Sequence, residues 1–395
     1  MSRRELVWAA AVFLVALVVW GAFAAGELFI GDSPELAGAA ARLGVAHPPG
    51  YPTFLLVSHL FLGPACTLSI PIATAANALA LLAAAAGVSL FWLGLRRFGL
   101  SRIPALIGAL AWACGPLVTG QGLTYEVHAL QHLLLGGLFL FIGRTAAGEE
   151  AGSPREGLAL AFFAGMVLTN HYSAAVLLPL VVWGLGRTLR GVEKGRRALW
   201  LGLAAAAFIL PLSAYLYLPL RAGADLAFDY GMTGNLPNLW AHLTGMGYAQ
   251  GYLAQGASAQ ALPAAGRAVF DSIPWPLWAI VPLGLVELFR ERRGLAVAGL
   301  ITPLLFVPLL LFYRIVDPLD YLAPLVMLAA FWCALGAERL GSYLKERRLL
   351  GAALAGAAAA LCLGWWLVSG MEARRPLSGR LARAGAEDFL RELTP

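Results

Sequence analysis

Two carboxylates lie one helical turn apart early in the chain. Asp32 and Glu35 occur in the sequence GDSPE, where Pro34 suits the first turn of a helix running to about Leu43. An i, i+3 spacing places both carboxylates on one side of that turn, and Asp32 or Ser33 is expected to cap the helix. Such a pair can supply a general base and its partner, but a helix cap followed by a solvated glutamate gives the same pattern.

A second polar group follows in the sequence GVAHPPGYP, residues 44–52. Three prolines fix φ and restrict their neighbours, and Gly50 permits a sharp turn. A rigid segment of this kind can hold His47 and Tyr51 in a defined place. A purely structural loop would have little need of these two side chains.

Other ionisable residues border apolar runs. Glu126 begins one such run, with His128 and His132 four residues apart on one helical face. A charged group at the edge of a membrane span usually faces a cavity or a partner, but Glu126 could also be favourable simply at a helix N-terminus. The three residues could bind a divalent metal, although their types are ordinary ligands and the pattern does not favour it.

Polar residues also interrupt or end later apolar runs. Asn170 and His171 separate two runs of about fourteen residues, where a packed, hydrogen-bonded corner and a substrate contact are equally compatible with the sequence. Asp317 and Asp320 are expected to cap the helix that follows them. An aromatic and amide-rich stretch that includes Asp229 and Tyr230 can recognise a sugar or an acceptor, or anchor interfacial helices.

Arg221 ends another apolar run and can grip phosphate oxygens with two parallel hydrogen bonds. The alternative is that its side chain simply reaches the lipid headgroups. Arg42 and Arg314 are weaker candidates for the same phosphate.

The composition places these residues in a membrane protein. The chain has 395 residues, of which 60% are hydrophobic and only 13% charged, and its mean hydropathy is +0.75. Soluble domains are about one quarter charged, so a soluble globule is excluded. The net charge of +6 could indicate nucleic-acid binding, but the positions of the arginines assign it to membrane orientation, so no nucleic-acid partner is expected.

The apolar runs predict an all-α polytopic protein with about eleven transmembrane helices. They lie at about 6–25, 71–95, 102–118, 126–143, 157–170, 173–186, 198–220, 275–289, 294–313, 321–338 and 349–368. The apolar run 54–62, bracketed by Pro52 and Pro64, is too short to cross and is interpreted as an interfacial or re-entrant helix. With the N-terminus cytoplasmic, most Lys and Arg residues fall on the inner side and every Asp on the outer side.

The same topology divides the chain. Residues 1–370 are expected to form a single transmembrane domain, followed by a short extracytoplasmic tail, 371–395. Two long outer stretches stand out. We call residues 26–70 the first segment, the expected catalytic loop with its short interfacial helices, and residues 221–274 the second segment.

The motifs, taken together, resemble the DUF2723 family. That family includes the TMEM260-type protein O-mannosyltransferases and belongs to the GT-C superfamily of polyprenyl-phosphate-sugar-dependent glycosyltransferases. The resemblance covers roughly residues 5–330 and rests on DSPE, LGVAHPPGYP, Asn77, YEVHAL, TNH and YLPLRA in that order. The chain departs from the family pattern at Pro34, usually Gly, at His128, usually aromatic, and in lacking a large soluble region after Gly370.

The resemblance implies a GT-C-type fold and an inverting transfer of a hexose, mannose by preference, from a polyprenyl-phosphate carrier to Ser or Thr hydroxyls of exported proteins. It implies an extracytoplasmic site in a bacterial plasma membrane and a lipid-linked sugar as co-substrate. The sequence requires no other cofactor, and it allows a divalent metal without favouring one. The expected catalytic residues are Asp32 as base and Glu35 as its partner; the expected donor-binding residues are Arg221, His47, Tyr51 and Arg42; and the further site candidates are Glu126, His128, Asn170 and His171.

Two alternatives stay open. A related GT-C enzyme could transfer another sugar or act on a glycan or lipid acceptor. A lipid or solute transporter without covalent chemistry would need polar residues leading to both faces, and the placement of every Asp on one side argues against it.

Overall fold

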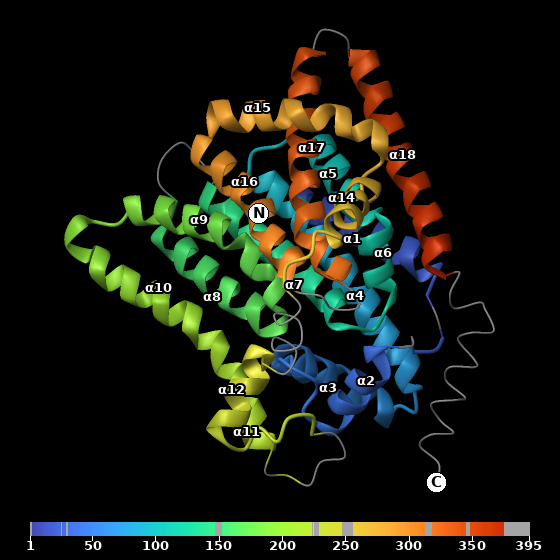
Figure 1. Cartoon of the computed structure of the whole chain (residues 1–395). Coiled ribbons are helices and arrows are strands. Elements are labelled where there is room, and N and C mark those ends of the chain that lie inside the picture. The colour runs from blue at the N-terminus through green and yellow to red at the C-terminus, as the bar shows by residue number, and fades with distance from the viewer. Residues whose placement is uncertain are drawn as a thin grey trace.

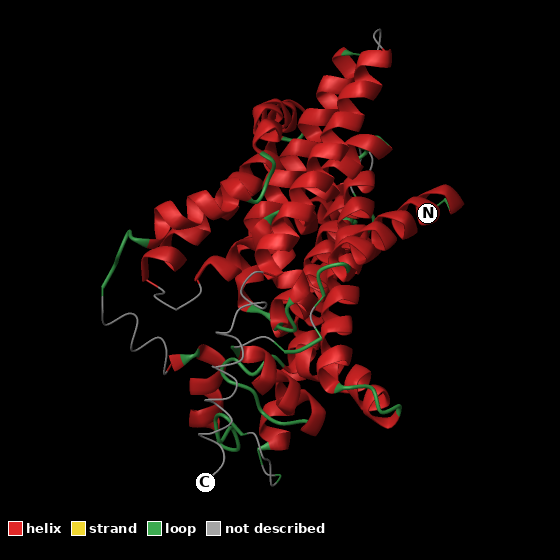
Figure 2. Ribbon diagram, turned by 90° about the vertical axis from the view of Figure 1, so that its right-hand side faces the viewer, coloured by secondary structure: helices red, strands yellow, loops and turns green. Residues whose placement is uncertain are grey.

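The chain is helical throughout the part that the computed structural model describes, residues 2–24, 26–28, 31–146, 152–222, 224, 229–246, 256–312, 318–344 and 348–374 (Figure 2). In chain order the α-helices are α1 (Arg3–Gly21), α2 (Asp32–Arg42), α3 (Pro52–Thr67), α4 (Ile72–Arg97), α5 (Arg102–Ala113), α6 (Pro116–Leu123), α7 (Val127–Ala146), α8 (Pro154–Asn170), α9 (Leu178–Arg190), α10 (Arg197–Leu212), α11 (Tyr217–Arg221), α12 (Leu236–Thr244), α14 (Ala261–Asp271), α15 (Val281–Glu291), α16 (Arg293–Phe312), α17 (Ala323–Tyr343) and α18 (Arg348–Arg374). Short 3₁₀ turns lie at Tyr172–Leu177, Lys194–Arg196, Ser213–Leu216, Trp275–Ile280 and Pro318–Leu322.

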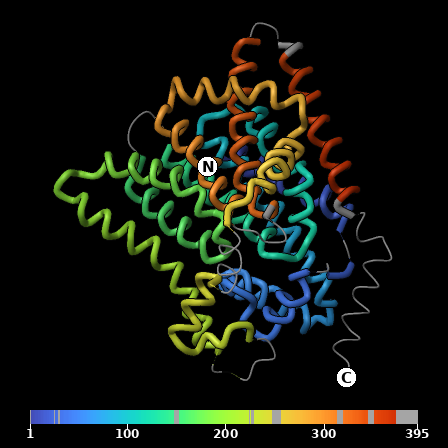
Figure 3. The backbone as a smooth tube through the Cα atoms, viewed as in Figure 1, coloured from blue at the N-terminus to red at the C-terminus, as the bar shows by residue number. Residues whose placement is uncertain are grey.

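The helices confirm a multi-pass membrane protein. Among the described residues, eight helices are long and apolar enough to cross a bilayer, and ten if two bent pairs each count as one span. The bent pairs are α5 with α6, at 70°, and α14 with the stretch Trp275–Glu291, at 94°, which is visible as a sharp turn of the tube in Figure 3. The remaining expected span, 157–170, coincides with α8, whose 17 residues are slightly short of the usual length of a membrane span. The count of eleven stays a prediction.

One local expectation for the first segment is wrong. Neither Asp32 nor Ser33 caps α2, because Gly31 is the N-cap residue and makes no side-chain hydrogen bond. Asp32 is instead the first helical residue, which leaves its carboxylate available for other contacts. The expected short helix around the apolar run 54–62 is present as α3, which starts at Pro52, continues through Pro64 to Thr67 and is not among the candidate spans.

The bundle core depends on close backbone approach. A methyl group built on Gly136 of α7 would lie 2.1 Å from the Gly87 carbonyl oxygen of α4. One on Gly284 of α15 would lie 1.9 Å from the Trp332 carbonyl oxygen of α17. Glycine at these positions lets neighbouring helices pack more tightly than larger residues would allow. Helices α10 and α18 lie at opposite edges of the bundle and bury little of their surface, as expected for helices that face lipid (Figure 1).

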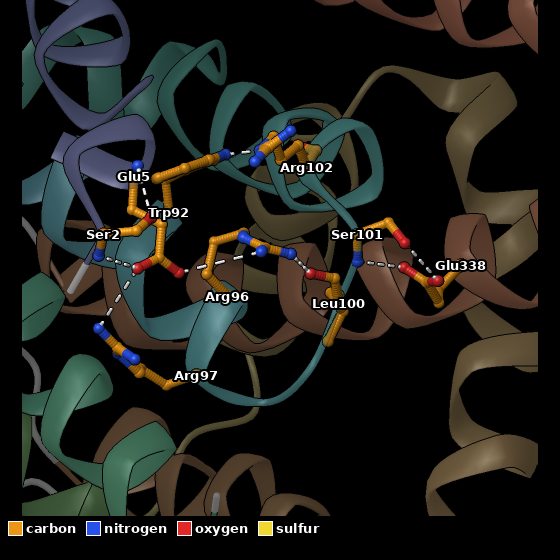
Figure 4. Close-up of polar contacts among 9 residues, drawn as sticks. All are labelled: Ser2, Glu5, Trp92, Arg96, Arg97, Leu100, Ser101, Arg102 and Glu338. Atoms are coloured by element: carbon orange, nitrogen blue, oxygen red, sulfur yellow. Dashed lines mark hydrogen bonds and ion pairs between the residues drawn. The ribbon is translucent and has the colours of Figure 1, made fainter. Parts of the chain in front are cut away.

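The two ends of the bundle differ. Helices α2, α3, α11 and α12 gather at one end, which we call the loop end (Figure 1). At the far end of α4, which we call the basic end, Glu5 lies 3.9 Å from Arg96 and 3.7 Å from Arg97 (Figure 4). Nearby, Glu338 accepts hydrogen bonds from the backbone N–H and the hydroxyl of Ser101 (Figure 4). These contacts join α1 to α4, and α17 to the start of α5, away from the loop end.

Candidate functional site

His47 is the centre of a hydrogen-bonded group at the loop end. Its backbone N–H and its Nδ1 each lie 2.8 Å from a carboxylate oxygen of Glu35. Its Nε2 lies 3.1 Å from the hydroxyl of Tyr51 and 3.5 Å from Oδ2 of Asp32. The imidazole is therefore held between two carboxylates. We call Asp32, Glu35 and His47 the Asp32 cluster.

The backbone of the first segment brings these residues together. Helix α2 carries both carboxylates in its first turn, and the chain leaves the helix at Leu43 in the left-handed conformation, with φ of 51°. Gly50 has φ of 91°, and a methyl group there would lie 2.7 Å from a Leu218 methyl carbon. Both the positive φ and the close packing require glycine. The chain thus folds back so that His47 faces the start of α2.

The surroundings of His47 favour its charged form. Burial by itself lowers the pKa of the imidazole, but the hydrogen bond to Glu35 and the charges of Glu35, Asp32 and Glu126 raise the pKa above its usual value. The Tyr51 hydroxyl donates to the Pro48 carbonyl oxygen at 3.5 Å, which leaves the hydroxyl oxygen to accept from Nε2–H. An imidazolium satisfies both sides of the ring.

The two carboxylates differ in accessibility. The side chain of Asp32 is 59% exposed, whereas that of Glu35 is 17% exposed and uses both oxygens on His47. Asp32 can therefore meet an incoming molecule, and Glu35 fixes the imidazole. One ligand atom from each residue of the cluster lies within 4.8 Å of the others, the spacing of a possible cation site in the described part of the chain.

Helix α11 and the start of the second segment hold the first segment in place. The Tyr217 hydroxyl donates to the Gly44 carbonyl oxygen at 2.7 Å, and the Tyr230 backbone N–H donates to the Val45 carbonyl oxygen at 3.2 Å. Arg221 Nε donates to the Leu43 carbonyl oxygen at 2.7 Å. The loop that carries His47 is thus tied to α11 and to the chain that follows it.

The arginines expected to bind phosphate lie beside this loop. Arg221 also donates from Nη2 to the Arg42 carbonyl oxygen at 3.4 Å, which leaves its Nη1 with no hydrogen bond among the described residues. Arg42 is the last residue of α2, and its side chain is exposed. Among the described residues, no Lys or Arg nitrogen lies within 4.0 Å of a carboxylate oxygen of Asp32 or Glu35.

Glu126, His128 and His132 do not form a joint metal site. Glu126 approaches the Asp32 cluster, since a methyl group on Gly31 would lie 3.8 Å from its Oε1 and its charge acts on His47. His132 is buried and its Nε2 lies 2.9 Å from Oε1 of Gln121. The two histidines share a helical face but contact different neighbours, since His132 bonds to Gln121 and the ring of His128 lies beside that of His171.

Asn170 and His171 have separate surroundings. Asn170 donates to the Val127 carbonyl oxygen at 3.0 Å and to Oε1 of Gln131 at 2.7 Å, so it forms a packed corner between α7 and α8. The ring of His171 stacks on Tyr51 at a centroid distance of 6.0 Å and lies 5.0 Å from the ring of His128. His171 and His128 thereby form a buried layer behind Tyr51.

Asp320 does not cap the helix that follows it. Helix α17 begins at Ala323, and its N-cap residue, Leu322, makes no side-chain hydrogen bond. The Asp320 carbonyl oxygen accepts from Nε2 of Gln121 at 2.6 Å. Asp317 and Arg314 lie outside the described residues, as do most of the tail 371–395 and the stretch 247–255 of the second segment.

His242 of α12 was missed as a site residue. It is buried, and Cβ atoms built on Gly50 and Gly231 would lie 3.0 and 2.3 Å from its two ring nitrogens. Burial, with the charge of His47, lowers the pKa of His242 to about 4, so it is neutral at pH 7. Only its place outside the apolar runs distinguished it in the sequence, because its partners are far away along the chain.

Solved structures define the class of fold. ArnT from Cupriavidus metallidurans matches 93% of this chain and 75% of its own, with a TM-score of 0.59, both bound to undecaprenyl phosphate, at 14% identity, and in the apo state, at 15%. An oligosaccharyltransferase from Archaeoglobus fulgidus matches 91% of this chain and 53% of its own, with a TM-score of 0.51 and 13% identity. The chain therefore has the helical membrane fold of the GT-C enzymes.

Sequence comparisons are more specific over part of the chain. Residues 32–190 match the family model described as the protein O-mannosyl-transferase TMEM260 N-terminal domain. The mouse protein O-mannosyl-transferase TMEM260 is 32% identical over 202 residues, which is 49% of this chain and 27% of the mouse protein. The resemblance to TMEM260-like proteins is confirmed for that region, and the chain corresponds to about a quarter of the mouse protein's length.

Proposed function

We propose that the protein is an inverting glycosyltransferase that takes a hexose, mannose by preference, from a polyprenyl-phosphate carrier. The acceptor in this proposal is a Ser or Thr hydroxyl of an exported protein. Two comparisons support it: the ArnT neighbour is bound to undecaprenyl phosphate, and the mouse relative is named as a protein O-mannosyl-transferase. The loop end would face the extracytoplasmic side of a bacterial plasma membrane, with the N-terminus cytoplasmic.

The exposed carboxylate of Asp32 beside His47 carries the proposal. In a single displacement the acceptor oxygen attacks the anomeric carbon on the face opposite the phosphate, and its proton passes to Asp32. The bond between the anomeric carbon and the phosphate oxygen breaks, and polyprenyl phosphate leaves with the electron pair. The His47 ring lies 3.5 Å from Oδ2 of Asp32 and would hold that carboxylate in place for this step.

Glu35 and Tyr51 would position His47 rather than touch the sugar. Glu35 holds His47 through one hydrogen bond to the backbone N–H and one to Nδ1 of the imidazole, both of 2.8 Å, and the Tyr51 hydroxyl contacts the opposite ring nitrogen. The proposed partners for the donor phosphate are Arg221 through Nη1 and, as an exposed neighbour, Arg42, because a guanidinium suits a phosphate oxygen. Glu126 would add negative charge beside the base, and the proposal includes no metal.

A transfer assay tests the proposal. Purified protein in lipid would be incubated with radiolabelled polyprenyl-phosphate-mannose and a peptide containing one Thr. We expect labelled peptide with the α or β linkage opposite to that of the donor. If label appears only on a glycan or lipid acceptor, the proposed acceptor is wrong. If label is transferred only from a different lipid-linked sugar, the proposed sugar is wrong. In both cases the protein is still a glycosyltransferase that uses a lipid-linked donor. The proposed function would be rejected if no labelled product formed with any of these substrates.

A further inference from the structure

An open pocket adjoins the Asp32 cluster. It has a volume of about 360 Å³, and its walls include Pro48 of the first segment and Asp229, Tyr230, Met232, Asn238 and His242 of the second. Pro48 directly follows His47, and the ring centroid of Tyr230 lies 6.3 Å from that of His47. A molecule in the pocket would therefore lie next to the residue that holds Asp32.

The walls of the pocket are fixed before anything binds. Oδ1 of Asp229 accepts from the backbone N–H groups of Gly231 and Met232 at 3.3 and 3.1 Å. Nδ2 of Asn238 donates to the Met232 carbonyl oxygen at 3.0 Å. These bonds set the turn that forms one wall. Binding would require little reorganisation of this turn, which favours a specific occupant.

The chemistry of the walls favours a cation on an apolar stem. Asp229 is the carboxylate of the lining. His242 adds no positive charge at pH 7, because burial and the charge of His47 lower its pKa to about 4. Pro48 and Met232 supply apolar surface. Lysine and arginine side chains combine such a stem with a charged end.

The rim of the pocket is exposed, and its residues lie outside the candidate membrane spans. Tyr230 is 57% exposed and Met232 is 75% exposed. A sugar carried by a lipid would approach along the membrane, whereas an exported polypeptide arrives from the aqueous side. The exposed rim therefore fits the polypeptide better than the donor.

We propose that this pocket is an acceptor subsite that binds a Lys or Arg side chain flanking the acceptor Ser or Thr. The inference rests on the proposed function, since it assigns a binding site to the acceptor polypeptide of that reaction. The acceptor hydroxyl would lie at Asp32 while the neighbouring basic side chain enters the pocket with its charge at Asp229. Substrate preference would then follow from one carboxylate that takes no part in the chemical step.

Peptide preference tests the subsite. Two peptides, with Lys or Ala next to a single Thr, would be compared at saturating donor. We expect the wild-type protein to favour the Lys peptide by about tenfold in kcat/KM. Asp229→Asn keeps an oxygen to accept the two backbone N–H groups and removes the charge, so the preference should fall to near one. The KM of the donor should stay unchanged.

Asp271→Asn is the matched control. Asp271 is also in the second segment, where it pairs with Arg267 at 3.3 Å, and it does not line the pocket. Its variant should retain the wild-type preference. The subsite is overturned if the wild-type protein transfers equally well to both peptides, or if Asp229→Asn keeps the preference.

Photo-crosslinking separates failure of the subsite from failure of the reaction. A benzoylphenylalanine incorporated at position 232 should crosslink the Lys peptide, and one at position 236 should not, because Leu236 is exposed but outside the pocket. Crosslinking at 232 without any sugar transfer would support the subsite and contradict the proposed chemistry. Transfer without crosslinking at 232 would contradict the subsite and leave the chemistry standing.

Discussion

The different surroundings of the carboxylates of Asp32 and Glu35 define what each can do. Glu35 is shielded and bound twice to His47, while Asp32 is exposed and lies 3.5 Å from the same ring. Glu35 therefore fixes the imidazole, and the imidazole in turn contacts Asp32. The arrangement joins a shielded carboxylate to an exposed one through a single imidazole.

The charge of His47 gives a pH-dependent contribution to stability. Because the pKa of His47 is raised in the folded protein, the contribution is fully present below the ordinary histidine pKa of about 6.5 and is lost as the pH rises through the raised value. His47→Gln should lower the free energy of unfolding by about 1–2 kcal/mol at pH 6. Thermal unfolding of both proteins from pH 5.5 to 9 would measure this difference.

The difference between wild type and His47→Gln should shrink as the pH rises. A difference that grows toward pH 9 would contradict a raised pKa of His47. His59→Gln is the control, because His59 lies in α3 and contacts the Ala40 carbonyl oxygen at 2.9 Å rather than a carboxylate. Its effect should not follow the same curve.

Local patterns predicted part of this site. Asp32, Glu35, His47 and Tyr51 could be grouped from the sequence because helical spacing and a proline-rich turn act over short distances. His242 could not, because it meets Gly50 only after almost two hundred intervening residues have folded. The different surroundings of His128 and His132 were also hidden, since a shared helical face does not specify the neighbours.

At the scale of elements, α11 and the chain after it act as a support for the first segment. Tyr217, Arg221 and Tyr230 all bond to backbone atoms of residues 42–45. Backbone atoms are present whatever the side chains are, so the sequence carries little sign of such support. This explains why the sequence suggested only phosphate binding or contact with lipid headgroups for Arg221.

A lysine at position 221 tests both uses of the arginine. Arg221→Lys keeps the charge but removes the planar fork, so we expect the KM of the lipid-linked donor to rise by about tenfold, with a small loss of thermal stability. Donor titrations and thermal unfolding would be measured on the same preparation. Arg267→Lys, an exposed arginine of the second segment, is the control.

A loss of stability with an unchanged donor KM would show that Arg221 only ties Leu43 in place. The phosphate assignment would then be wrong, while the support of the first segment would stand. The control should change neither quantity.

The helix bounds show what sequence patterns at this scale can specify. Apolar length located every long helix, because burial in lipid demands it. The cap of α2 was mistaken because Gly31 stands where a side-chain cap was expected, and the full length of α3 was not apparent because Pro64 is accommodated inside the helix. Both outcomes depend on packing around the turn rather than on local preference.

At the scale of the whole molecule, α4 and α7 pack so closely that a single added carbon at Gly136 should destabilise the bundle. Gly136→Leu would place a carbon 2.1 Å from the Gly87 carbonyl oxygen, so the helices must separate. We expect a loss of about 3 kcal/mol in stability or no folded protein. Gly202→Leu on α10 is the control, since nothing lies within 4 Å of a methyl group at Gly202.

Size-exclusion profiles and thermal unfolding in detergent would compare these two variants. Equal stability of Gly136→Leu and Gly202→Leu would contradict the packing of α4 on α7. The number of spans is less well specified by sequence, because two pairs of shorter helices are bent by 70° and 94° and each pair is either a broken span or a re-entrant loop.

The whole fold determines where the Asp32 cluster lies. A GT-C-like bundle places an exposed carboxylate at the end where two long segments meet, with an open pocket beside it. The most direct test is mannose transfer from polyprenyl-phosphate-mannose to a Thr peptide by the wild type, by Asp32→Asn and by Glu27→Gln, an exposed carboxylate of the same segment. Donor binding would be measured in parallel.

The proposed role of Asp32 predicts that Asp32→Asn lowers kcat by about 10²–10⁴-fold while donor binding stays within about threefold of wild type. Glu27→Gln should transfer at the wild-type rate. Transfer by Asp32→Asn at the wild-type rate would contradict Asp32 as the base.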